Sequence, residues 1–144
     1  MKPKKIPYQE FKKIYSKVPR LCVDLIIKNK KGVLLTKRDI SPNKGWWHFP
    51  GGTVLMHETL KDTVQRVGEE ELNTKVKILK SLGILEYTKG SGLGCPISVT
   101  FLVKPINKIV GGEQARVVDF FIDPPSKTLP EVKDYIKKGF KTSF

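Results

Sequence analysis

The sequence predicts an α/β fold in which helices lie on both sides of a mixed β-sheet, an α/β/α sandwich. Apolar residues alternate along several short segments, as they do in strands, and recur at helical spacing along three others. Because the two kinds of segment interleave along the chain, we expect them to pack as layers of one sandwich. A chain of 144 residues is long enough for a substantial core. We therefore expect residues 1–144 to form a single domain.

The first predicted elements are an amphipathic helix and a β-hairpin. Residues 7–18 predict the helix, because Pro7 suits a first helical turn and the apolar residues after it share one face. We expect this helix to pack on the flank of the domain, with a contact in a homodimer as the alternative. Residues 21–28 alternate as a strand, Asn29 to Gly32 form a turn, and residues 33–38 return antiparallel.

The rest of the chain predicts three more strands and two more helices. A glycine turn at Gly51 and Gly52 precedes a helix from about Thr59 to Leu72, whose apolar side chains should face the sheet: Leu60, Val64, Val67 and Leu72. The remaining strands are expected at residues 76–87, 97–103 and 117–122, with loops at 40–45, 89–94 and 110–114 and a last helix at 129–140.

Composition limits the classes of function. The formal net charge is +13, but 23 of the 27 cations are lysines scattered along the chain, and only four are arginines, which phosphate and base recognition favours. We therefore do not expect nucleic acid as the main partner. The chain has no run of 18 apolar residues and no signal-peptide core, which predicts a cytoplasmic protein without membrane contact. Cys22 and Cys95 lie in apolar strand patterns, and we expect two buried, reduced thiols.

The most informative pattern combines the glycine turn with acids on the following helix. Five residues separate Gly52 from Glu58, seven separate Glu58 from Arg66, and Glu70 and Glu71 lie four and five residues beyond Arg66. On a helix, Arg66 and Glu70 share a face and Glu71 lies on its flank. Acids near a helix C-terminus oppose the helix dipole, at a cost of roughly 0.3–1 kcal/mol each. In a basic chain they indicate a divalent cation held by oxygen ligands, with a solvated acidic surface as the alternative.

This spacing resembles the signature of the Nudix hydrolase superfamily, over about 23 residues that begin at Gly52. Val67 stands where many members have a glutamate that acts as a metal ligand or general base, and Asn73 replaces the closing glycine. The resemblance implies a Nudix fold and a hydrolase of a nucleoside diphosphate linked to another group, with Mg²⁺ or Mn²⁺ as cofactor. The expected catalytic residues are Glu70 and Glu71, as metal ligands, and Arg66, which would pair with Glu58 or Glu70.

From about Arg20 to Leu72 the chain more closely resembles the GDP-mannose mannosyl hydrolases, whose signature also lacks that glutamate. The likeness includes Asp24, the Lys37-Arg38 pair and the run from Gly45 to Gly52. By position, it implies that a magnesium ion would be held by the backbone carbonyl of Gly51, by Glu71 and by Gln114. Ala115 and Thr53 replace the histidine base and an arginine of those enzymes.

Three residues are candidates for contact with the substrate. We expect Asp24 to be half-buried and to need a polar partner. Its position in the resemblance implies that it accepts a hydrogen bond from sugar or base hydroxyls, and the alternative is a pair with Arg38 on the neighbouring strand. Arg38 is also a candidate for binding a nucleotide phosphate. Trp46 either anchors the loop and core or stacks on a base.

The general base is not evident from the sequence. With Val67 and Ala115 at both familiar positions, the candidates are His57, Glu70, Glu113 or a metal-bound hydroxide. The sequence thus predicts a magnesium-dependent hydrolase whose substrate is a nucleotide or, foremost, a nucleotide sugar. The alternatives are a nucleotide-binding module with weak catalysis and a housekeeping or RNA-end pyrophosphatase, the latter favoured by the net charge.

Overall fold

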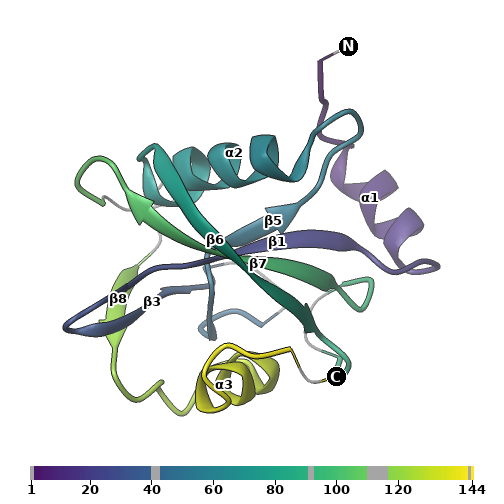
Figure 1. Ribbon diagram of the computed structural model, residues 1–144. Helices are drawn as coiled ribbons and strands as arrows, with labels where there is room; N and C mark the ends of the chain where they lie inside the picture. Colours follow the sequence, from purple (N-terminus) through teal and green to yellow (C-terminus); the bar gives the residue numbers. More distant parts are fainter. Residues whose placement is uncertain (1, 40–42, 91–92, 110–116, 143) are drawn as a thin grey trace.

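The computed structural model describes residues 2–39, 43–90, 93–109, 117–142 and 144, which form two β-sheets covered by helices (Figure 1). The first sheet has the order β5 (Gly51–Thr53), β1 (Leu21–Ile26), β7 (Ile97–Pro105) and β6 (Val76–Glu86). The second joins β2 (Lys28–Asn29), β3 (Gly32–Lys37) and β4 (Trp47–His48), with β8 (Val118–Phe121) paired to β3. The helices are α1 (Tyr8–Tyr15), α2 (Leu60–Leu72) and α3 (Pro130–Lys137).

The first sheet is mixed, as predicted, because β1 runs parallel to β7 and antiparallel to β5. The predicted hairpin is much shorter than expected. Only Lys28 and Asn29 of β2 pair with β3, opposite Val33 and Gly32. The predicted antiparallel return of residues 33–38 is thus confirmed, but the paired part of the hairpin is short. Both hydrogen-bonding edges of β1 are already occupied, by β5 and β7.

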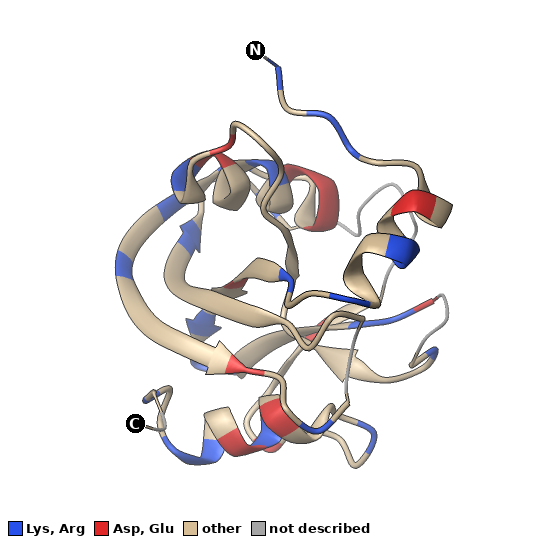
Figure 2. Ribbon diagram, turned by 90° about the vertical axis from the view of Figure 1, so that its right-hand side faces the viewer, with Lys and Arg blue, Asp and Glu red and all other residues tan. Residues whose placement is uncertain are grey.

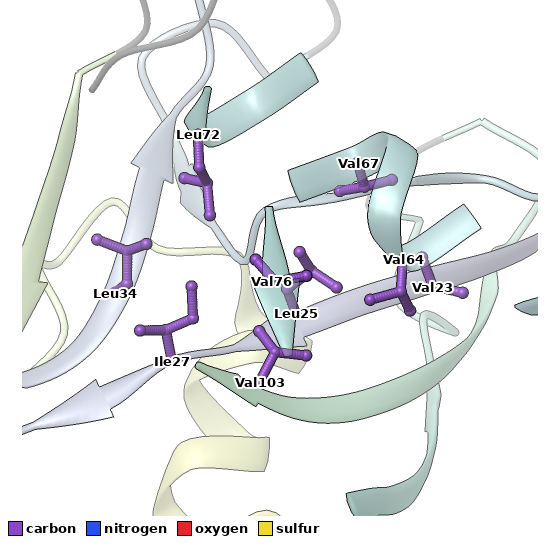
Figure 3. Close-up of a cluster of buried hydrophobic side chains, with 9 residues drawn as sticks. All are labelled: Val23, Leu25, Ile27, Leu34, Val64, Val67, Leu72, Val76 and Val103. Carbon is purple, nitrogen blue, oxygen red and sulfur yellow. The ribbon is translucent and has the colours of Figure 1, made fainter. Parts of the chain in front are cut away.

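Helix α2 covers one face of the sheet, as its apolar spacing predicts. Val64, Val67 and Leu72 of this helix lie in a buried cluster with β1 residues such as Val23 and Leu25 (Figure 3). Leu60 packs against the edge of the same cluster. The opposite face of the sheet is covered by α3, whose Val132 and Tyr135 belong to a second buried cluster (Figure 1). This arrangement confirms the predicted sandwich.

The ends of α2 are fixed by local hydrogen bonds. The side chain of Thr59 accepts a bond from the backbone of Asp62, and the Asp62 carboxylate accepts one from the backbone of Thr59, which forms a capping box. Asn73 ends the helix in the left-handed conformation expected of it, with φ 53° and ψ 37°. Inside the helix, a Cβ at Gly68 would lie 3.1 Å from the carbonyl oxygen of Thr74. The glycine thus permits close packing of α2 against the chain that follows it.

The later predicted strands and the last helix lie where they were expected: β6, β8 and α3 are shorter than predicted, and β7 extends two residues further, to Pro105. One of the two cysteines differs from the prediction. Cys22 is buried but Cys95 is exposed, because it lies before β7 with a left-handed φ of 42° and not within the strand. The predicted loops at 40–45 and 110–114 fall partly or wholly outside the described residues. No helix in the described part of the chain is long and apolar enough to span a membrane.

Candidate active site

Arg66 is the centre of a network that ties helix α2 to the strand before it. Its Nε donates to Oε2 of Glu58 at 2.8 Å, and its Nη2 donates to Oε1 of the same carboxylate at 2.9 Å. Nη2 also donates to the carbonyl oxygen of Thr53 at 2.7 Å, and Nη1 to Oε1 of Glu70 at 3.0 Å. The predicted pairing of Arg66 with Glu58 or Glu70 is therefore confirmed, and it occurs with both residues at once.

Hydrogen bonds keep this network ionised. Burial of Glu58 opposes its ionisation, but the bonds from Arg66, from the backbone of Leu55 and from Thr63 outweigh that effect and lower the pKa of Glu58. For Glu70 the balance is similar. Burial raises its pKa, but bonds from Lys5 and Arg66 outweigh burial and hold the pKa of Glu70 below its ordinary value. Both acids are therefore carboxylates at neutral pH.

A groove of about 940 Å³ runs along this network. Its walls come from β5 and the loop after it, from the side of α2, and from the N-terminal segment with α1. Figure 2 shows the acidic last turns of α2 in red and the lysine-bearing N-terminal segment in blue on the same side of the molecule. Of the predicted site residues, four line the groove: Gly51, Arg66, Glu70 and Glu71. The structure thus brings the predicted catalytic residues to one surface.

The N-terminal segment reaches the acids of α2 directly. Nζ of Lys5 lies 2.7 Å from Oε2 of Glu70, in an ion pair whose side chains are 66% and 35% exposed. No sequence pattern singles out Lys5. The three lysines ahead of α1 carry no pattern that specifies a partner 65 residues away. Only the folded chain shows that this lysine and Arg66 share Glu70.

The two glycines form a strand rather than the predicted turn. Gly51 and Gly52 belong to β5, which pairs with Asp24 and Val23 of β1. A Cβ on Gly51 would collide with Oδ1 of Asp24 and would lie 2.7 Å from the carbonyl oxygen of Val23. The glycine at this position therefore lets β5 approach β1, which explains its presence without a turn.

The donor atoms around the groove suit a hard divalent cation. Mg²⁺ is commonly held by one or two carboxylates, with waters and substrate phosphates completing its shell. Glu70, Glu71 and the backbone of Gly51 provide oxygens of this kind at one groove. Among the described residues, no three His, Cys, Asp or Glu side chains form a metal-binding group. A cation here would therefore depend on backbone, water or substrate oxygens as well. Gln114, predicted as a further ligand, lies outside the described residues.

Asp24 occupies a different place from the one expected. Its side chain is not half-buried but only 6% exposed, and Tyr87 Oη donates to its Oδ2 at 2.6 Å. Asp24 shares its face of β1 with Ile26, which packs in the cluster under α3. The alternative considered for it, a pair with Arg38 on a neighbouring strand, would need β3 beside β1, and β3 does not adjoin β1. The proposed site therefore does not include Asp24.

The other two predicted substrate contacts do not line the groove either. Trp46 packs against the cluster under α3, which is the anchoring role considered for it. Arg38 is half-buried at the end of β3, where its backbone pairs with Trp46 and Gly45. Three residues were considered as bases. Glu70 lines the groove, whereas His57 is exposed and is not among the described residues that line it. Glu113 lies outside the described residues.

Comparison with known proteins identifies the class to which this fold and groove belong. Residues 18–131 match the model of the NUDIX domain, and the chain belongs to this family. It is 45% identical over 83 residues to the low-salt glycan biosynthesis protein Agl8 of Haloferax volcanii, which covers 58% of this chain and 53% of that protein. It is 33% identical over 104 residues to an ADP-ribose pyrophosphatase of Methanocaldococcus jannaschii, which covers 72% of this chain and 62% of that protein. The chain thus spans between half and two thirds of these relatives.

Solved structures show the same fold. The MutT NUDIX hydrolase from Burkholderia pseudomallei matches with a TM-score of 0.73 at 22% identity, over 83% of this chain and 96% of that one. An ADP-ribose pyrophosphatase from Streptococcus suis matches with a TM-score of 0.64 at 22% identity, over 88% and 96% of the two chains. Hydrolases of this family generally use divalent metals such as Mg²⁺ or Mn²⁺.

Proposed function

We propose that this protein is a divalent-metal-dependent hydrolase of nucleoside diphosphates that carry a second group, foremost nucleotide sugars. The observation that carries the proposal is the groove in which Arg66 holds Glu70 beside Glu71 and the Gly51-Gly52 backbone. The named relatives support the substrate class, since one is an ADP-ribose pyrophosphatase and the other serves glycan biosynthesis. The GDP-mannose hydrolase-like subtype remains the finer form of this proposal.

Each residue has a distinct role in the proposed site. Glu71 and Glu70, with the carbonyl of Gly51, would hold the cation. When bound, the cation would neutralise the diphosphate and activate a water molecule. Arg66 is a positioning residue, because its bonds to Glu58 and to Thr53 fix the direction in which Glu70 points. Lys4 and Lys5 at the rim of the groove add positive charge that attracts an anionic substrate.

One observation favours a second candidate, a nucleotide-binding module with weak catalysis. Val67, at the position of the frequent family glutamate, is 1% exposed and belongs to the core under α2. It can neither bind a cation nor accept a proton. Glu70 is also a poor base, because Lys5 and Arg66 lower its pKa. Tight binding of nucleotide sugars without product formation over hours would favour this candidate.

A substrate screen tests the proposal. Nucleotide sugars and ADP-ribose would be incubated with Mg²⁺ or Mn²⁺, and the products would be scored as a nucleotide plus sugar phosphate or as a nucleoside diphosphate plus free sugar. Hydrolysis in ¹⁸O water would then show whether carbon or phosphorus is attacked. We expect metal-dependent turnover of at least one nucleotide sugar.

The acids provide a matched pair of variants. Glu71→Gln should lower metal-dependent turnover about 100-fold or more, since even partners of metal ligands cost up to about that factor. Glu69→Gln is the control, because Glu69 is exposed on the same turn and lies outside the described lining of the groove. Unchanged turnover in Glu71→Gln, or an equal loss in both variants, would count against the assignment.

A further inference from the structure

One wall of the groove is aromatic and apolar, in contrast to its acidic end. Tyr8, Phe11 and Tyr15 of α1 line the groove, together with Leu21 and Met56. Tyr8 is 59% exposed and Met56 is 76% exposed, so a substantial apolar surface faces solvent here. Isolated exposed apolar residues are ordinary, but a group of them along one groove indicates a binding surface.

The aromatic wall is held against β5, next to the proposed catalytic residues. Nη1 of Arg20 donates to Oγ1 of Thr53 at 2.7 Å, and its guanidinium lies 5.6 Å from the ring centroid of Phe11. The rings of Phe11 and Tyr15 pack edge to face, with their centroids 4.7 Å apart. Arg20 therefore connects α1 to the residue whose carbonyl Arg66 also binds. These contacts hold the rings of Phe11 and Tyr15, so this part of the wall is preorganised for a ligand.

The chemistry of the aromatic wall favours one part of a nucleotide, the base. A sugar needs polar partners for its hydroxyl groups, whereas a nucleobase presents an apolar π-face that stacks on aromatic rings. The wall offers rings and aliphatic side chains, and Lys5 lies at the acidic end, where it pairs with Glu70. Charge and polarity along the groove thus match a base at one end and a diphosphate at the other.

We propose that the rings of Tyr8 and Phe11 form the subsite for the nucleobase of the substrate. This assignment rests on the proposed function, which places the diphosphate at Glu70 and Glu71. Residues 4–15 precede the region, 18–131, that matches the family domain. The base would therefore be selected by a segment outside the matched region, and not by Trp46, which packs under α3.

Two analogues separate base binding from diphosphate binding. The α,β-methylene analogues of ADP, GDP and UDP cannot be hydrolysed at that bridge, and methylenediphosphonate carries the same bridge without a base. Binding of each would be measured by calorimetry with Mg²⁺. Tyr8→Ala should weaken binding of the preferred nucleotide analogue about 5- to 150-fold, the range expected for the loss of one base–aromatic stack, and leave methylenediphosphonate unchanged.

A conservative variant and a control variant make the test specific to the rings of α1. Phe11→Leu removes a ring while it retains apolar volume, so it should reproduce the selective loss without unfolding α1. Phe144→Ala is the control, an exposed aromatic residue outside the groove lining. Unchanged nucleotide binding in both α1 variants would overturn the base subsite, as would an equal loss for both ligands. A dimer that dissociates in Tyr8→Ala with analogue binding intact would also overturn it and assign the wall to a contact between copies of the chain.

The same experiment distinguishes failure of the subsite from failure of the proposed function. If the unmodified protein binds none of the analogues and hydrolyses no nucleotide sugar, both proposals are wrong. If it hydrolyses a nucleotide sugar and the α1 variants bind and hydrolyse it equally well, only the base subsite is wrong.

Discussion

Tyr87 donates a hydrogen bond of 2.6 Å to the carboxylate of Asp24 in the interior of the protein. Burial raises the pKa of Asp24 to about 6, and the bond from Tyr87 offsets this effect only in part. The acid lies next to Thr100 across the β1–β7 ladder, and Thr100 in turn is bonded to Tyr135 of α3 at 2.7 Å. An ionisable group thus lies on the α3 side of the sheet, directly opposite Gly51 in the β1–β5 pair.

This burial predicts a specific dependence of stability on pH. Because the pKa of Asp24 in the folded protein, about 6, exceeds its ordinary value of 3.8, the folded state binds the proton more tightly than the unfolded state. The stabilisation from Asp24 is therefore complete below about pH 4 and is lost as the pH rises to about 6. Two pKa units correspond to about 3 kcal/mol. Urea unfolding at a series of pH values measures the change.

Asp24→Asn is the control for this pH dependence. The variant should lose the decline between pH 4 and 6, and the difference between the two proteins isolates Asp24 from the other acids. Glu58 and Glu70 have lowered pKa values, so their contributions have the opposite sign and appear at lower pH. Parallel curves for the two proteins would show that Asp24 has an ordinary pKa.

The two thiols should differ strongly in reactivity. Burial raises the pKa of Cys22 to about 11, whereas Cys95 is exposed. Since the thiolate is the reactive form, we expect Cys95 to react with a disulfide reagent at pH 8 at least about 100 times faster than Cys22. Native Cys95→Ser protein should therefore remain unlabelled until it is unfolded. Rapid labelling of that variant in the native state would contradict the burial of Cys22.

The sequence predicted the layers of the fold better than the order of its strands. The alternation of Val23 and Leu25 against Ile26 specified the two faces of β1, and both faces have cores as expected. Alternation does not specify which strand lies alongside, however, and β1 pairs with β5 and β7 rather than with β3. Strand neighbours depend on contacts between distant residues, which a local pattern does not encode.

In the candidate site, too, contacts within one element could be predicted from the sequence, and contacts between distant elements could not. The helical spacing of Arg66 and Glu70 predicted their pairing, because residues four apart on a helix share a face. The roles considered for Asp24 and Trp46 depended on which cluster each side chain joins, and both pack under α3. The contact of Lys5 with Glu70 and the aromatic wall of α1 arise from the path of the N-terminal segment across the groove.

The Arg66–Glu58 pair should contribute to stability as well as to the site. The Glu58 side chain is only 4% exposed, so loss of Arg66 would leave a nearly buried carboxylate without its main partner. We expect Arg66→Ala to lower the free energy of unfolding by about 2–4 kcal/mol, slightly below the range for a fully buried pair. Arg66→Lys should lower the free energy of unfolding less, because lysine keeps the positive charge. It should still lower it, because lysine cannot bind both oxygens of Glu58 as arginine does. Lys61→Ala, on the exposed side of α2, is the control in urea unfolding and should change little.

Lys5 should compete with a divalent cation for Glu70. Its ammonium group lies 2.7 Å from the carboxylate that the proposed function assigns to the cation. An exposed ion pair is worth roughly 0.2–1 kcal/mol, so Lys5→Ala should tighten Mn²⁺ binding by up to about 5-fold. The same variant should weaken binding of methylenediphosphonate, because the groove loses a cation that attracts the anion. Calorimetry with each ligand alone measures both effects.

Lys2→Ala separates the contact with Glu70 from net charge. It removes the same unit of charge from an exposed position in the same segment, outside the described lining of the groove. If the ion pair is responsible, only Lys5→Ala should bind Mn²⁺ more tightly, and high salt should reduce the difference between the two variants. Equal tightening in both variants would instead indicate a general effect of charge. Weaker Mn²⁺ binding in Lys5→Ala would contradict the role of Glu70 as a ligand, because removal of a competitor cannot weaken the site for which it competes.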